Sequence, residues 1–184
     1  MHVKEIQKLV YTSLFAALIA VGAYMAVPIP IVPVPIVMQN LFILLAGLLL
    51  GSRYGVASMG LYLLVGSMGI PVFAGGKGGL AHFLGPTGGY LIGFTVCAWL
   101  TGFISERFRG RLRADITAVV IGSLTVYVFG VPWLKVVTGM DWTKAVLLGM
   151  APFLIGDAIK ATAAILVARA VRPVLERSMD LSSA

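Results

Sequence analysis

The sequence predicts an all-α integral membrane protein: a single domain, residues 1–184, that forms a bundle of six transmembrane helices with both termini in the cytoplasm. Of its residues, 59% are hydrophobic and 11% are charged, and the mean hydropathy is +1.00, far above that of soluble domains. No Asp or Glu occurs between Glu5 and Glu106. The alternating pattern of a membrane β-barrel is absent, so the backbone groups within the bilayer have to be satisfied inside helices.

Six apolar stretches are candidates for the roughly 20-residue span that crosses a bilayer as a helix. They cover residues 9–27, 37–52, 55–70, 88–105, 115–133 and 145–171. The first follows Lys4 and Lys8, as in a signal peptide, but it is too long for the apolar region of one and further spans follow, so we expect it to be retained. The second and third are short and are separated only by "GSRYG" at 51–55.

The distribution of basic residues predicts the orientation of the spans. With the N-terminus inside, ten Lys and Arg residues fall in cytoplasmic segments and three fall outside. The inner ones are Lys4, Lys8, Arg53, Arg107, Arg109, Arg111, Arg113, Arg169, Arg172 and Arg177, and the outer ones are Lys77, Lys135 and Lys144. Because these bases cluster between apolar runs, the net charge of +7 indicates contact with the lipid bilayer surface rather than with nucleic acid.

Two outer segments are predicted to be irregular. Four prolines in "PIPIVPVP" (28–35) forbid a helix, and residues 71–89 contain seven glycines, which is typical of a lid or binding loop. Within the latter, "GKGGLA" (76–81) fits a dinucleotide-binding pattern, but the acid required further on is missing, so nucleotide binding is not expected. His2 and His82 are isolated, so no metal site is predicted.

The strongest functional signal is the pair Asp157 and Lys160 in "FLIGDAIKATAAILVA". Three residues apart, they share one helical face, and a charge at mid-membrane costs about 3 kcal/mol, so such residues usually face a cavity. We therefore predict that they contact a polar ligand; the alternative is a mutually neutralising pair that only holds the bundle together. Pro152 is expected to kink the span just before them.

Small residues and aromatic residues admit two interpretations each. Ala16 and Ala20 are spaced for close helix contact, which within one chain most often means internal packing. Phe73 and Tyr90 fall near the predicted outer boundary, where an interfacial aromatic belt and a ring stacked on a ligand are the alternatives.

Four motifs together resemble the BioY family, the substrate-binding components of energy-coupling factor (ECF) transporters for biotin. They are "PVPIVMQNLFILLAGLLLG" (33–51), "GIPVFAGGKGG" (69–79), "GPTGGYLIGF" (85–94) and "PFLIGDAIKA" (152–161). The resemblance extends from about residue 10 to residue 172, and four motifs in the right order are specific. Met38 and Asn40 depart from the Thr-Leu-Gln-Thr type of sequence usual there, while Gln39 is in place.

The resemblance implies a multi-pass protein of a prokaryotic plasma membrane that captures biotin from outside. It implies no cofactor, metal or catalytic residue, with ATP used only by two cytoplasmic ATPase subunits that work with a transmembrane coupling subunit. A small-residue motif on the first helix contacts the coupling subunit in such transporters, and Ala16-x-x-x-Ala20 matches it. The substrate-binding residues predicted on this basis are Asp157, Lys160, Gln39, Phe73, Gly79 and Tyr90.

The chemistry of biotin suits such a site. Its ureido ring offers two N–H donors and one acceptor, so that Asp157 could accept and Lys160 could donate, while apolar walls hold the rest. Three alternatives stay open on the sequence: the same scaffold binding another small vitamin, a membrane enzyme that uses Asp157 as acid or base, and a purely structural subunit.

Overall fold

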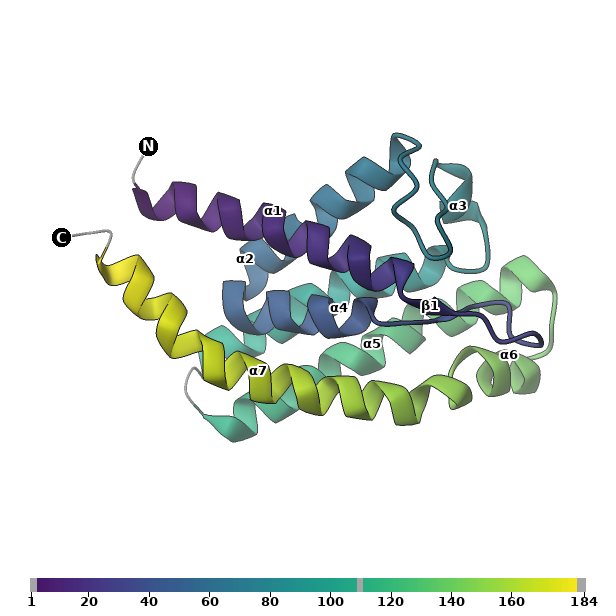
Figure 1. The fold of residues 1–184 in the computed structure, drawn as a ribbon. Helices are drawn as coiled ribbons and strands as arrows, with labels where there is room; N and C mark the ends of the chain where they lie inside the picture. Colours follow the sequence, from purple (N-terminus) through teal and green to yellow (C-terminus); the bar gives the residue numbers. More distant parts are fainter. Residues whose placement is uncertain (1–2, 109–110, 182–184) are drawn as a thin grey trace.

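The computed structural model describes residues 3–108 and 111–181, which form a bundle of helices lying side by side (Figure 1). Helix α1 (Val3–Tyr24) leads into a short antiparallel hairpin in which β1 (Ala26–Val27) pairs with β2 (Ile36–Val37). The later elements are α2 (Gln39–Ser67), α3 (Ala81–Leu84), α4 (Gly88–Arg107), α5 (Leu112–Thr138), α6 (Trp142–Gly149), the 3-10 helix η1 (Ala151–Phe153) and α7 (Leu154–Leu181). The start of α1 and the end of α7 lie at one end of the bundle, whereas the hairpin and α3 lie at the other.

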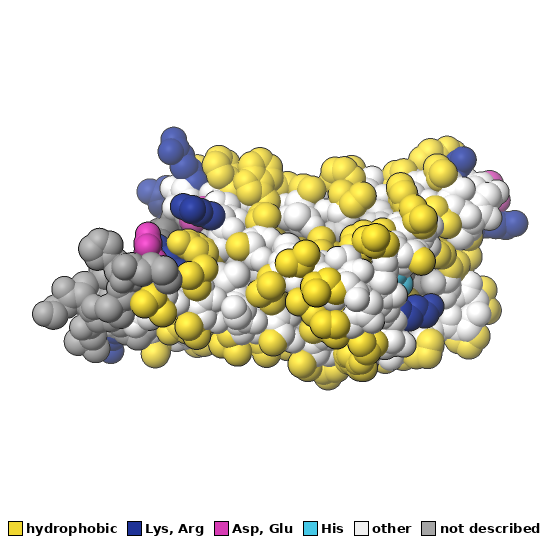
Figure 2. All heavy atoms as spheres, turned by 90° about the horizontal axis from the view of Figure 1, so that it is seen from above, with side chains coloured by type: hydrophobic (Ala, Val, Ile, Leu, Met, Phe, Trp, Pro, Cys, Tyr) yellow, Lys and Arg dark blue, Asp and Glu magenta, His cyan; other side chains and the backbone are white. Residues whose placement is uncertain are grey.

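The composition of the bundle surface is that of a membrane protein. Five helical stretches in the described part of the chain are long and apolar enough to span a bilayer, namely Glu5–Tyr24, Gln39–Ser67, Gly88–Arg107, Leu112–Thr138 and Trp142–Leu175. Figure 2 shows hydrophobic side chains along the length of the bundle and Lys and Arg side chains at its two ends. Large apolar side chains are exposed on every long helix, which is favourable only in contact with lipid or another protein.

The predicted break between the second and third spans is a sharp bend inside α2 (Figure 1). Gly51 has φ 82° and ψ −177°, and a Cβ there would lie 1.9 Å from Glu106 Oε1, so only glycine fits. A Cβ on Gly55 would lie 3.3 Å from Gly47 Cα. In a straight helix these two residues are about 12 Å apart along the axis, so the chain folds back on itself here.

The expected single span at 145–171 is interrupted. The chain leaves helical geometry at Met150 (φ −133°, ψ −53°), and Pro152 lies in the 3-10 turn that follows. The kink expected from this proline is therefore confirmed, but it separates two helices, and α7 continues beyond the predicted end to Leu181. One consequence is that Asp157 occupies the first turn of α7.

Small residues allow α4 to pack closely against both α2 and α5. A Cβ on Gly93 would lie 2.8 Å from Val126 Cα, and one on Gly89 would lie 2.2 Å from the Trp133 side chain. These glycines therefore serve internal packing, which brings the beginnings of α2 and α4 and the middle of α5 around a common space.

Candidate functional site

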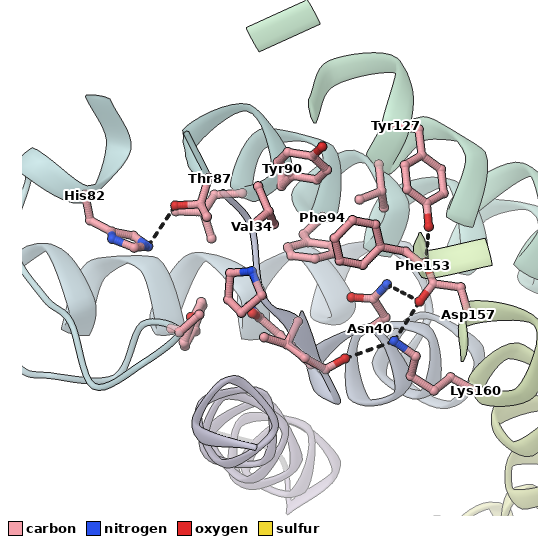
Figure 3. Close-up of a pocket in the computed structure, with 17 residues that line it drawn as sticks. Val34, Asn40, His82, Thr87, Tyr90, Phe94, Tyr127, Phe153, Asp157 and Lys160 are labelled. Carbon is pink, nitrogen blue, oxygen red and sulfur yellow. Dashed lines mark hydrogen bonds and ion pairs between the residues drawn. The ribbon is translucent and has the colours of Figure 1, made fainter. Parts of the chain in front are cut away.

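A pocket lies near the hairpin end of the bundle, bounded by side chains from the hairpin and from α2, α4, α5 and α7. Its apolar walls come from the hairpin, α4, α5 and the turn before α7, with Val34, Pro35, Leu91, Phe94, Val126 and Phe153 among them. Its polar groups come from α2, α3, the start of α4, α5 and α7 (Figure 3). A mostly apolar cavity with a few converging polar groups is the usual form of a binding site for a small organic molecule.

The predicted charged pair is formed and lies in the wall of this pocket. Lys160 Nζ is 2.6 Å from Asp157 Oδ1, and the two side chains are 7% and 11% exposed. Lys160 Nζ also donates to the backbone oxygen of Val37, at 2.9 Å, which ties α7 to strand β2. The pair therefore closes one side of the pocket and fixes the hairpin to the last helix.

Two further side chains hold the Asp157 carboxylate (Figure 3). Asn40 Nδ2 donates to Oδ1 at 3.1 Å, and the Tyr127 hydroxyl donates to Oδ2 in a short hydrogen bond. Both partners line the pocket, one from α2 and the other from α5. The cluster is electrically neutral overall, which lowers the free-energy cost of burying its charges. It joins three helices at the pocket.

The structure places four of the six predicted substrate-binding residues in the pocket wall. Besides the charged pair, Gln39 and Tyr90 line it, and the Tyr90 hydroxyl donates to the Gly149 oxygen at 2.7 Å, so its ring is held by α6. Phe73 and Gly79 do not line it. Gly79 instead has φ +91° and donates its N–H to the Gly66 oxygen, at 2.7 Å, so it anchors the glycine-rich loop.

Phe73 is fully buried and supports the pocket from behind. A Cβ on Gly66 would lie 2.2 Å from Phe73 Cζ, so the ring occupies the space that this glycine leaves open. It stacks on His82, with centroids 4.8 Å apart, and packs edge-on against Tyr62, at 5.5 Å. Because both of these rings line the pocket, Phe73 positions the site without lining it.

A second, wider cavity lies outside the pocket, between the proline-rich hairpin and the glycine-rich loop. It shares His82 and Thr87 with the pocket, and His82 Nε2 lies 3.0 Å from Thr87 Oγ1 at this common wall. Burial and, to a smaller degree, the charge of Lys77 lower the pKa of His82 from its usual 6.5. Its place in this shared wall could not be predicted, because His82 stands alone in the sequence.

The alanines predicted to dock a partner lie on the inner side of α1. Ala16 is 7% exposed and belongs to the core, and Ala20 is half-buried and packs against the same core. Their positions favour the internal-packing alternative. The exposed small residues of this helix are Ser13 and Ala17.

A second buried charge cluster lies at the opposite end of the same helices. Arg172 donates to both carboxylate oxygens of Asp115, at 3.0 and 3.2 Å, and to Ser105 Oγ, at 3.1 Å. It also donates to the oxygen of Leu48, at 3.1 Å, in the last turn before the bend in α2, where helix carbonyls lose their partners. Arg172 is one of the ten bases predicted to be cytoplasmic, and no sequence pattern indicates its pairing with Asp115. This cluster binds α2, α4, α5 and α7 together.

Comparison with known families shows which family the chain belongs to. The sequence signature described as the BioY family matches residues 1–177. The chain belongs to the BioY family. Its relatives include "Probable biotin transporter BioY" of Pyrococcus horikoshii, which is 40% identical over 91% of this chain and 96% of the relative. "Biotin transporter BioY" of Rhizobium etli is 41% identical over 89% of this chain and 91% of the relative.

A solved structure has the same fold. It is described as the crystal structure of "the S-component for biotin from an ECF-type ABC transporter", and it matches with a TM-score of 0.87, 31% sequence identity and coverage of 94% of each chain. The BioY kinship expected from the sequence motifs is thereby confirmed.

Proposed function

We propose that this chain binds biotin and serves in its uptake as the substrate-binding component of an ECF-type transporter. The observation that carries the proposal is the pocket: a neutralised Asp157–Lys160 pair and several buried amide and hydroxyl groups within largely apolar walls. This composition fits a ligand with a polar ureido ring and an apolar sulfur ring and chain. The family membership and the solved biotin component support the same ligand.

We further propose six membrane crossings with both termini cytoplasmic. The bend at Gly51 supports this, because each half of α2 then makes one crossing. The start of α1 and the end of α7 lie at the same end of the bundle, as an even number of crossings requires (Figure 1). A reporter inserted after Leu80 should be accessible from outside the cell, and one inserted after Arg111 from inside; the reverse pattern contradicts the proposal.

Transport itself is proposed to depend on other subunits: a transmembrane coupling subunit and two cytoplasmic ATPases in a prokaryotic plasma membrane. ATP is then used by those subunits and no cofactor is needed here. The exposed face of α1 around Ser13 and Ala17 replaces Ala16 and Ala20 as the docking surface that we assign to the coupling subunit.

Equilibrium binding of radiolabelled biotin to the purified chain in detergent tests the function. We expect saturable binding that excess unlabelled biotin removes and that lipoate and thiamine leave unchanged. Competition by another vitamin, with no binding of biotin, favours the same scaffold with a different substrate. Conversion of biotin to a new product by the chain alone would instead support the enzyme alternative. The four hydrogen-bond and ion-pair contacts of the Asp157–Lys160 pair favour a role in binding the ligand rather than in catalysis.

A further inference from the structure

Three buried polar atoms in the pocket wall have no hydrogen-bond partner among the described residues. They are Asn40 Oδ1, Gln39 Nε2 and the Tyr62 hydroxyl oxygen. Gln39 and Tyr62 lie close enough for their side chains to interact with each other, so they partly serve as each other's partners. A buried polar group without a partner costs about 1–3 kcal/mol, so the Asn40 oxygen, which has no such neighbour, indicates that a ligand supplies the missing partner.

The orientation of the Asn40 amide is determined by its neighbour. Asn40 Nδ2 lies 3.1 Å from Asp157 Oδ1, and an ionised carboxylate only accepts hydrogen bonds. Turning the amide over would bring two acceptor oxygens together, so Nδ2 faces Asp157 and Oδ1 faces the cavity (Figure 3). Asn40 therefore presents a fixed acceptor to the ligand space.

The charged pair is less available to a ligand than Asn40 is. The oxygens of Asp157 already accept from Lys160, Asn40 and Tyr127, and Lys160 already serves Asp157 and the Val37 carbonyl. The unmet capacity of the pocket is thus a neutral acceptor, Asn40 Oδ1, on the residue next to a neutral donor, Gln39 Nε2. A donor and an acceptor of this kind complement the edge of a cyclic urea.

We propose that Asn40 Oδ1 accepts a hydrogen bond from one ring N–H of the bound urea and makes Asn40 a specificity-determining residue. This inference rests on biotin as the proposed substrate. Asp157 holds the Asn40 amide and Lys160 in place, and Lys160 keeps a third N–H donor for the ligand beside its contacts with Asp157 and the Val37 carbonyl. A ligand that lacks the N–H leaves Oδ1 buried without a partner, and one with a ring oxygen there adds a repulsion between two acceptors.

Two cyclic carbamate analogues of biotin, each with one of the two ring N–H groups replaced by oxygen, test the proposal. The wild-type chain should bind one of them at least about tenfold more weakly than biotin, which corresponds to about 1.4 kcal/mol. In Asn40→Leu, biotin binding should weaken and this discrimination should largely disappear. If that variant does not fold, Asn40→Ser, whose shorter side chain does not replace Oδ1, is measured with the same expectation.

Tyr127→Phe is the matched control, because it removes a different hydrogen bond to Asp157 and leaves Asn40 Oδ1 in place. It should weaken binding of biotin and of the two analogues by the same factor. Equal binding of both carbamates and biotin to the wild-type chain would overturn the role of Asn40, as would discrimination that survives in Asn40→Leu. Failure of the wild-type chain to bind biotin at all overturns the proposed function itself, which separates the two failures.

Discussion

Separate removal of the two charges of the Asp157–Lys160 pair should destabilise the chain more than their joint removal. In Asp157→Asn, the Lys160 ammonium loses its counter-charge and keeps only neutral acceptors such as the Val37 carbonyl, in a site where its side chain is 7% exposed. We expect a loss of about 4 kcal/mol in the free energy of unfolding, within the range for a stranded buried charge. In Lys160→Met, Asn40 and Tyr127 still donate to the carboxylate, so the loss should be smaller, about 3 kcal/mol.

In the double variant Asp157→Asn/Lys160→Met no charge is stranded, and we expect a loss of about 2 kcal/mol, less than in either single variant. The measurement is denaturant unfolding in detergent, followed by tryptophan fluorescence, with biotin affinity measured on each folded variant. Losses that simply add in the double variant would refute the idea that the two charges neutralise each other. Near wild-type affinity in the folded double variant would show that biotin does not depend on this pair.

Three further outcomes follow from other parts of the structure. Arg172→Met should lower the free energy of unfolding by about 2 kcal/mol, because the buried Asp115 carboxylate loses both hydrogen bonds from Arg172 and keeps those from Ser105 and, at 3.5 Å, Arg169. Biotin affinity of the folded fraction should change little. Ala16→Trp should destabilise the isolated chain, because Ala16 is buried. Ala17→Trp should leave the free energy of unfolding and biotin binding unchanged but block copurification with the coupling subunit, because Ala17 is exposed. The opposite pattern would show that Ala16 is the docking residue. Because the pKa of His82 is lowered in the folded loop, the unfolded loop binds a proton more readily, and loop packing should weaken as the pH falls through about 6.5. Trypsin should then cleave faster at Lys77. A cleavage rate that follows only the pH profile of trypsin itself would contradict this.

The membrane class and the central charged pair were predictable because each depends on a local pattern. A mean hydropathy of +1.00 identifies a membrane protein regardless of how its helices pack. Asp157 and Lys160 lie three residues apart, so their shared face follows from helix geometry alone. The bend at "GSRYG" and the kink at Pro152 were visible for the same reason, since glycine and proline act on the backbone where they stand.

Contacts between distant segments could not be predicted in this way. Asn40 and Tyr127 meet Asp157 across 117 and 30 residues, and the partner of Arg172 lies 57 residues away. The family resemblance placed Phe73 among the substrate-binding residues, whereas in the structure its ring fills the gap left by Gly66 and lies behind the pocket wall. Helix spacing alone likewise does not show which side of α1 faces inward, and Ala16 proved to be buried.

The placement of charges on α7 also bears on how the chain is made. Asp157, Lys160 and Arg172 are each bonded to groups on β2, α2, α4 or α5, all of which are synthesised before α7. An isolated helix with several charges is a poor candidate for release into lipid, since each mid-membrane charge costs about 3 kcal/mol. We therefore expect α7 to leave the translocon only after it has packed against the earlier helices. A ribosome stalled within α7 should then hold a chain whose earlier helices are made but still lack their ion-pair and hydrogen-bond partners on α7.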